Sequence, residues 1–151
     1  MKVKKMEDWK KVAQEIAAQI RSGTIIALSG PLGAGKTTLV QALAKELGCR
    51  SVPKSPTFSL VRTYKLHKRT GDPAGRPYRL IHVDAYRIED EKDVPPLGLE
   101  ELVAEPGTVM AIEWPDNVRV WLNQQENPIL HVTIDMHHNE ERRVKIALRE
   151  R

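Results

Sequence analysis

One short segment constrains the chain more than any other: Gly30-Pro-Leu-Gly-Ala-Gly-Lys-Thr37 matches the pattern G-x-x-x-x-G-K-[ST] in full. Its glycines allow a tight turn whose amide groups point inward and form a nest for phosphate oxygens. Lys36 can place a positive charge on the phosphates, the Thr37 hydroxyl can ligate magnesium, and a helix beginning there turns its positive end toward the anion. The segment predicts a nucleotide-binding loop made of Gly33, Ala34, Gly35, Lys36, Thr37 and Thr38.

The sequence around this loop predicts a strand before it and a helix after it. Thr24–Leu28 is short, β-branched and apolar on both faces, as in a buried parallel strand. From Thr37, apolar residues at helical spacing continue for about 11 residues to Gly48, a residue suited to end a helix. Nearer the N-terminus, apolar residues at three- and four-residue steps predict an amphipathic helix: Met6, Trp9, Val12, Ala13, Ile16, Ala17 and Ile20.

The remaining elements are predicted to be mainly strands. Ser59–Tyr64 and Arg79–Val83 are candidate partners, joined by the polar stretch Lys65–Pro77. Further elements are expected at Leu97–Val103 (a short helix), Thr108–Ile112 (a strand), and Leu130–Ile134 with Val144–Leu148 (a hairpin). This order predicts an α/β, P-loop NTPase-like, three-layer fold with a mixed, mainly parallel central sheet and a C-terminal β-hairpin.

Length and composition narrow the class of protein. The chain has 151 residues, 40% of them hydrophobic and 29% charged, so we expect residues 1–151 to form a single globular domain. The longest clean apolar stretch, Ile25–Leu28, is far shorter than the ~20 residues of a membrane span. The N-terminus has no apolar segment of the kind found in signal peptides, and one cysteine, Cys49, excludes an internal disulfide. A cytoplasmic protein without a membrane or disulfide partner is expected.

Two predicted apolar strands each end in a carboxylate, a group that the loop would need nearby. Leu80–Asp84 ends in an acid, and so does Val109–Glu113. Ligands gather at the carboxyl ends of parallel strands, and a nucleotide loop needs a further carboxylate to hold metal or orient water. Taken singly, either acid has a surface ion pair as an alternative role. Their shared position favours Asp84 and Glu113 as functional residues.

The charges are unevenly distributed along the chain. The formal net charge is +4. The segment from Arg62 to Arg79 has six basic residues and one acid, whereas the segment from Asp84 to Glu105 has eight acids and two basic residues. Such segregation is typical of a surface that binds a partner or a polyanion. The alternative is that the charged faces are simply solvated.

Five motifs together make the chain similar to a known family. They are Leu28-Ser-Gly-Pro-Leu-Gly-Ala-Gly-Lys-Thr-Thr38, Lys54-Ser-Pro-Thr-Phe-Ser-Leu-Val61, His82-Val-Asp-Ala-Tyr-Arg87, Leu97-Gly-Leu-Glu-Glu-Leu102 and Ile112-Glu-Trp-Pro115. The chain resembles the TsaE family, formerly YjeE, small bacterial P-loop ATPases of tRNA threonylcarbamoyladenosine biosynthesis. The motifs extend from residue 28 to residue 115.

The resemblance implies roles for the matched residues. Lys36 would bind phosphate, while Thr37 and Glu113 would hold magnesium. Asp84 would act in catalysis, as a base or through the metal shell, and Thr57 would sense the γ-phosphate. The cofactors would be ATP or ADP with Mg2+.

For other residues the sequence leaves two alternative roles. Trp114 would line or cover the nucleotide site, although from the residues alone a core tryptophan is the alternative. Tyr86 and Arg87 have two alternative roles, as contacts to a partner or as structural caps. Outside the matched motifs, Arg69 and Arg76 of the basic stretch are the candidates for an arginine finger, with solvated loop residues as the alternative.

The resemblance also implies a regulatory role. The chain would be a slow, Mg-dependent ATPase that is stimulated by its partner, the TsaB–TsaD complex, on which it docks. That complex modifies position 37 of tRNA. The chain would therefore contact tRNA only indirectly, through the complex. A P-loop small-molecule kinase is the alternative enzyme class. A GTPase is disfavoured because the sequence has no Asn-Lys-x-Asp motif, and an RNA-binding module is disfavoured because aromatic residues make up only 5% of the chain.

Overall fold

The computed structural model describes residues 1–50, 60–67 and 75–150, which include a seven-stranded mixed sheet. The strand order is β1-β7-β6-β2-β5-β4-β3. The four central strands are parallel: β6 (Ile129–Met136), β2 (Ile25–Ser29), β5 (Thr108–Glu113) and β4 (Arg79–Asp84). Three antiparallel strands complete the edges: β3 (Val61–Lys65), β7 (Arg142–Arg149) and β1 (Lys2–Val3).

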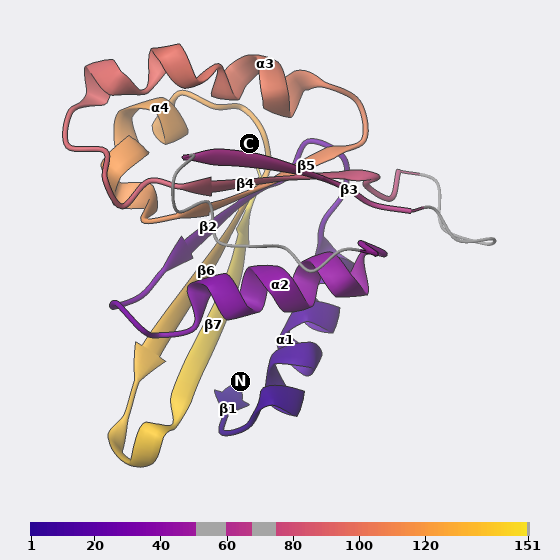
Figure 1. The fold of residues 1–151 in the computed structure, drawn as a ribbon, viewed down its shortest axis with the longest axis vertical. Helices are drawn as coiled ribbons and strands as arrows, with labels where there is room; N and C mark the ends of the chain where they lie inside the picture. The colour runs from indigo at the N-terminus through magenta and orange to yellow at the C-terminus, as the bar shows by residue number, and fades with distance from the viewer. Residues whose placement is uncertain (51–59, 68–74, 151) are drawn as a thin grey trace.

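Helices cover both faces of the sheet, so the fold has the three layers that the sequence predicts (Figure 1). On one face lie α1 (Met6–Gln19) and α2 (Lys36–Glu46). The other face carries α3 (Leu99–Ala104), α4 (Arg119–Asn123), and the 3-10 helices η1 (Glu91–Asp93), η2 (Pro95–Leu97) and η3 (Pro115–Val118). A fourth 3-10 helix, η4 (His138–Glu140), forms the turn between β6 and β7.

Strand alternation explains why the central strands are apolar on both faces. In β2, Ile26 and Leu28 pack in the core beneath α1 and α2, whereas Ile25 and Ala27 pack in the core beneath α3 and α4. Successive side chains of a strand point to opposite faces. Each face therefore receives its own buried apolar layer, and β2, which leads into the loop from Gly30 to Gly35, is fixed from both sides.

The two long helices have the predicted positions, with local corrections. The apolar stripe of α1 is buried from Trp9 to Ile16, but Met6 is 72% exposed and does not belong to the core. At its start, the backbone amides of Lys4 and Lys5 donate to the Asp8 carboxylate. The hydrogen bond from Lys4 is the main cause that lowers the pKa of Asp8.

Helix α2 ends as the sequence predicts, at a left-handed glycine. Gly48 has φ +94° and donates to the Lys45 carbonyl, while the Cys49 amide donates to the Ala44 carbonyl. These two bonds are the pair that closes a Schellman motif. The motif satisfies the last carbonyls of the helix.

Other elements differ from the sequence prediction. The helix predicted at Leu97–Val103 begins at Leu99, because Pro95–Leu97 forms a 3-10 turn that ends at the left-handed Gly98. The C-terminal hairpin is present, and its first strand pairs in parallel with β2 as part of the central sheet. Sequence periodicity missed β1 and α4, which have two and five residues and are too short to show a period. Within the described ranges, no helix is long and apolar enough to cross a membrane.

Gly33 and Gly35 both have left-handed backbone conformations, and they allow a test of how tightly α1 packs against the loop. Gly35 has φ +106°, and a Cβ there would run into the Trp9 ring, whereas Gly33 has φ +78° with open space around it. We predict that Gly35→Ala lowers the free energy of unfolding by about 1–3 kcal/mol more than Gly33→Ala, since only the former adds overpacking. Urea denaturation measures both, and equal losses would contradict this packing account.

Candidate functional site

The candidate site lies where the carboxyl ends of the parallel strands meet the N-terminus of α2. The loop from Gly30 to Gly35 connects β2 to α2. Asp84 ends β4 directly opposite Glu113, which ends β5, and Glu113 also pairs with Leu28 of β2. The structure thus brings the two predicted carboxylates and the predicted loop to one edge of the sheet.

Lys36 is held inside the loop. Its ammonium donates to the carbonyl oxygens of Gly30 at 2.5 Å and Pro31 at 3.0 Å, and it lies 3.9 Å from the centre of the Trp114 ring. The side chain is only 5% exposed. Burial lowers the pKa of Lys36, and the nearby charges of Glu113 and Asp84 oppose that change. The buried ammonium suits an anionic ligand that would complete its neutralisation.

Glu113 joins the loop helix to two strands. The Thr37 hydroxyl lies 3.0 Å from both of its carboxylate oxygens, and His82 Nε2 lies 2.6 Å from Oε2. Glu113 is 3% exposed and His82 is 1% exposed. A buried carboxylate is stabilised by such partners, so the three side chains form one network at the base of the site.

His82 is the site residue that reasoning from strand ends overlooked. It opens the motif His82-Val-Asp-Ala-Tyr-Arg87, in which only the later residues have an expected role. The alternation of side chains along a strand indicates that His82 belongs to the site, because it lies two residues before Asp84 and therefore on the same face of β4. Its other ring nitrogen, Nδ1, is buried and has no hydrogen-bond partner among the described residues.

Asp84 and Trp114 are half-buried residues at the ends of the strands that carry the site. The Tyr86 amide donates to Asp84 Oδ1 at 3.1 Å, which fixes the carboxylate at the strand end. Trp114 directly follows Glu113 and has left-handed backbone angles, φ 60° and ψ 55°. Its ring lies 5.1 Å from the exposed Tyr86 ring, centre to centre. Trp114 is therefore only partly a core residue, because it contacts the Lys36 ammonium at the site.

The predicted loop residues are found together. Ala34 is fully buried, and its amide donates to the Pro31 carbonyl at 3.1 Å. Gly35 caps α2, whose first amides, including those of Thr37 and Thr38, lack intrahelical acceptors in any α-helix. Amides of this kind bind phosphate, and hydroxyl and carboxylate oxygens such as those of Thr37 and Glu113 are the ligands that magnesium prefers.

Three predicted residues are not among those that the structure places at the site. Thr57 and Arg69 fall outside the described residues. Arg76 donates to the Glu46 carbonyl at 3.0 Å, at the C-terminal end of α2. The phosphate loop is at the other end of that helix, so Arg76 in this structure does not reach the site and is not a free, solvated loop residue.

Described parts of both charged stretches lie away from the loop. Of the acidic stretch, Glu91, Glu100 and Glu101 line a cavity of about 280 Å³ between η1, α3 and α4. Of the basic stretch, Lys65 and Arg79 line a second hollow beside β3 and β4. The two stretches also meet on the folded surface, because Arg79 Nη1 lies 2.9 Å from Glu105 Oε2.

Comparisons with known proteins agree on one family. A family model described as "Threonylcarbamoyl adenosine biosynthesis protein TsaE" matches residues 3–145. The tRNA threonylcarbamoyladenosine biosynthesis protein TsaE of Aquifex aeolicus is 40% identical over 110 residues, which cover 72% of this chain and 70% of that protein. For the protein of the same description from Bacillus subtilis the identity is 34% over 124 residues, covering 82% and 71%. A crystal structure of Bacillus subtilis YdiB is similar with a TM-score of 0.69 and 26% identity, over 97% of this chain and 82% of that chain.

The buried bond between His82 and Glu113 generates a prediction that needs no ligand. A double-mutant cycle with His82→Ala and Glu113→Ala is expected to give a coupling energy of about 0.5–3 kcal/mol, because the two side chains share one network. Urea denaturation supplies the four free energies of unfolding. The control cycle pairs His82→Ala with Glu126→Ala, an exposed acid before β6 at the opposite end of the sheet. Additivity in both cycles would count against the network.

Proposed function

Since the chain belongs to the TsaE family, whose members act in tRNA threonylcarbamoyladenosine biosynthesis, we propose that it binds ATP with Mg2+, hydrolyses it slowly, and acts as a nucleotide-dependent partner of the TsaB–TsaD complex. One observation carries the proposal: the buried Lys36 ammonium lies inside the loop, next to the Thr37 hydroxyl bonded to Glu113. The family match also favours this function over a small-molecule kinase.

The proposed roles follow from the geometry of the side chains. Lys36 and the first amides of α2 would hold the terminal phosphates, because an ammonium group and the N-terminal amides of a helix both attract anions. The Thr37 hydroxyl and the Glu113 carboxylate would hold Mg2+, which neutralises phosphate charge when bound. His82 would keep the Glu113 carboxylate in its orientation.

The remaining roles concern the attacking water. Asp84, fixed by the Tyr86 amide, would accept the proton of the water or orient it. Trp114 would cover the phosphates and limit the access of solvent. The role of Thr57 in sensing the γ-phosphate stays a prediction.

Slow hydrolysis by the isolated chain is part of the proposal. An arginine finger is worth about 10³–10⁵ in rate. Arg76 is bonded at the far end of α2, Arg69 stays a candidate for the finger, and in the proposal the TsaB–TsaD partner supplies the stimulating group. We place the protein in the cytoplasm, acting as one ATPase domain over residues 1–151 and meeting tRNA through the complex.

Lys36→Ala tests nucleotide binding. We expect the dissociation constants for ATP and ADP to rise about 10- to 100-fold, because a charge-assisted hydrogen bond to phosphate is lost. Isothermal titration calorimetry with Mg2+ measures them. Lys45→Ala, which changes an exposed lysine in the last turn of the same helix, is the matched control. Unchanged affinity in Lys36→Ala would remove the basis for the loop assignment.

The carboxylates and the partner are tested together. ATP hydrolysis is expected to accelerate when purified TsaB–TsaD is added to the wild-type chain. Asp84→Ala and Glu113→Ala should retain nucleotide but lower the stimulated rate by about 100-fold or more. Phosphate release is the measurement, and Glu126→Ala serves as the control.

The two parts of that experiment fail separately. No stimulation of the wild-type chain would contradict the proposed partner. Stimulated rates like wild type in both carboxylate variants would contradict the two-carboxylate site and leave the partner in place.

A further inference from the structure

The C-terminal hairpin forms an outer wall of the phosphate loop. A Cβ at Gly30 would lie only 2.8 Å from the Ile134 carbonyl oxygen, so β6 packs directly against the start of the loop. From β7, Arg142 donates through Nη2 to the Gly33 carbonyl at 3.2 Å. In Figure 1 the hairpin, in orange to yellow, runs past the turn between β2 and α2. Two strands that are remote in sequence therefore contact the loop.

The Arg142 hydrogen bond leads to Lys36 through one peptide group. The carbonyl of Gly33 and the amide of Ala34 belong to the same peptide, and that amide donates to the Pro31 carbonyl at 3.1 Å. The Pro31 carbonyl also accepts from the Lys36 ammonium at 3.0 Å. Hydrogen bonds on the two sides of a peptide group strengthen each other. Arg142 thus acts on the acceptor that positions the phosphate-binding ammonium.

Few packing contacts surround Gly33 and Leu32 at the tip of the loop. Gly33 adopts φ +78°, and no heavy atom among the described residues, outside its chain neighbours, lies within 4 Å of where its Cβ would be. The neighbouring Leu32 side chain is 74% exposed. Few packing contacts mean that a loop can open locally at low cost. The hydrogen bond from Arg142 to the Gly33 carbonyl therefore restrains a part of the loop that packing leaves free, next to the buried Ala34.

Arg142 is itself held in place. It pairs in the sheet with Met136 and with Val3. Its Nη1 donates to the Glu140 carbonyl at 3.1 Å, in a turn where Asn139 and Glu140 adopt left-handed φ angles of 65° and 61°. Its Nε is buried without a partner among the described residues, so part of the guanidinium has already lost water.

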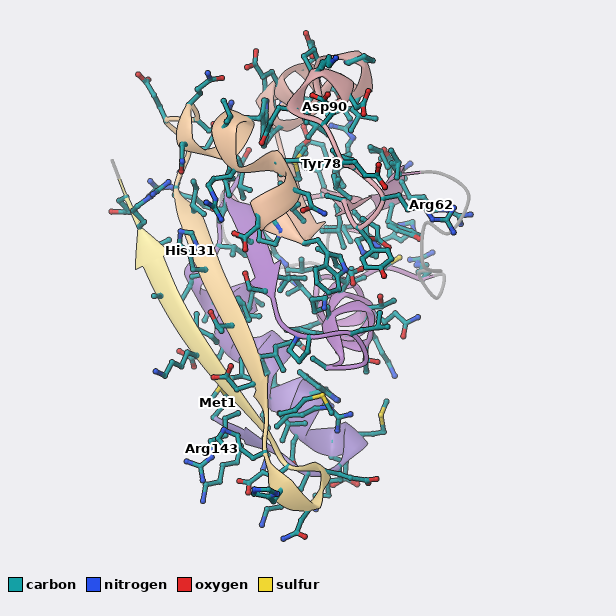
Figure 2. All side chains as sticks on the ribbon, turned by 90° about the vertical axis from the view of Figure 1, so that its left-hand side faces the viewer. Met1, Arg62, Tyr78, Asp90, His131 and Arg143 are labelled. Atoms are coloured by element: carbon teal, nitrogen blue, oxygen red, sulfur yellow. The ribbon has the colours of Figure 1, made fainter. Side chains whose placement is uncertain are left out.

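The next residue is a natural comparison. Arg143 is exposed and has its charge near the Glu141 carboxylate, at 3.9 Å. Figure 2 shows Arg143 beside Met1, near the turn of the hairpin. Successive strand residues point to opposite faces, so the hairpin carries one arginine that contacts the loop and one that does not.

We propose that Arg142 is a positioning residue of the phosphate loop, and that through it the C-terminal hairpin sets the affinity for the terminal phosphates of the nucleotide. This inference rests on the proposed function. Arg142 acts through the Gly33–Ala34 peptide and the Pro31 carbonyl, not by contact with the nucleotide.

The test compares Arg142→Met, Arg142→Lys and Arg143→Met in the full chain. Methionine retains the apolar stem and removes the donors, and lysine keeps a charged donor. Calorimetry with ADP and Mg2+ should show a dissociation constant raised about 3- to 10-fold in Arg142→Met, since a partly exposed charge-assisted bond is lost. Arg142→Lys should recover part of the affinity, and Arg143→Met should bind like wild type.

A second readout separates positioning from general stability. Hydrogen exchange of the Ala34 amide, followed by NMR without nucleotide, should be faster in Arg142→Met, with the amides of the β6–β7 ladder unchanged. Where that variant melts at a lower temperature, both measurements are made at a temperature at which circular dichroism shows it folded. Wild-type affinity and wild-type Ala34 exchange in Arg142→Met would overturn the inference. Failure of the wild-type chain to bind ADP would instead contradict the proposed function.

Discussion

The site depends on one buried carboxylate. Glu113 accepts the Thr37 hydroxyl from the start of α2 and lies against the imidazole of His82 on β4, so a single side chain connects a helix and two strands. Desolvating a carboxylate is costly unless partners replace water. The positions of Thr37 and His82 are consequently coupled, and the phosphate loop has a defined orientation relative to the strand that carries Asp84.

The local part of this site was predictable from the sequence, because the loop motif and strand-end acids are defined by short spacings. Lys36, Thr37, Asp84 and Glu113 meet as expected. The bond between Glu113 and His82 was not predictable in the same way, since it depends on the register of two strands that are distant in sequence. Family resemblance identified the motif around His82 without indicating what the ring contacts.

Long-range pairing also explains what the sequence could not show about the fold. The hairpin strands were recognisable by composition, but nothing in Leu130–Ile134 indicated that β6 would lie parallel to β2. Arg142 likewise looked like one of several basic residues in the tail. Its contact with Gly33 arises only because β7 follows β6 to the side of the loop. Short elements such as β1 form mainly through tertiary pairing and carry almost no local signal.

The strand order has a consequence for how the chain folds during synthesis. Strand β2 ends at Ser29, yet its neighbours β5 and β6 are formed by residues 108–113 and 129–136. Pairings this distant in sequence are slow to form because a long loop must close first. On the ribosome, β2 has to wait for most of the chain to emerge before both of its edges are covered. The early apolar strand is therefore without its neighbours for most of translation, and the sheet edge around the Gly30–Gly35 loop is completed late.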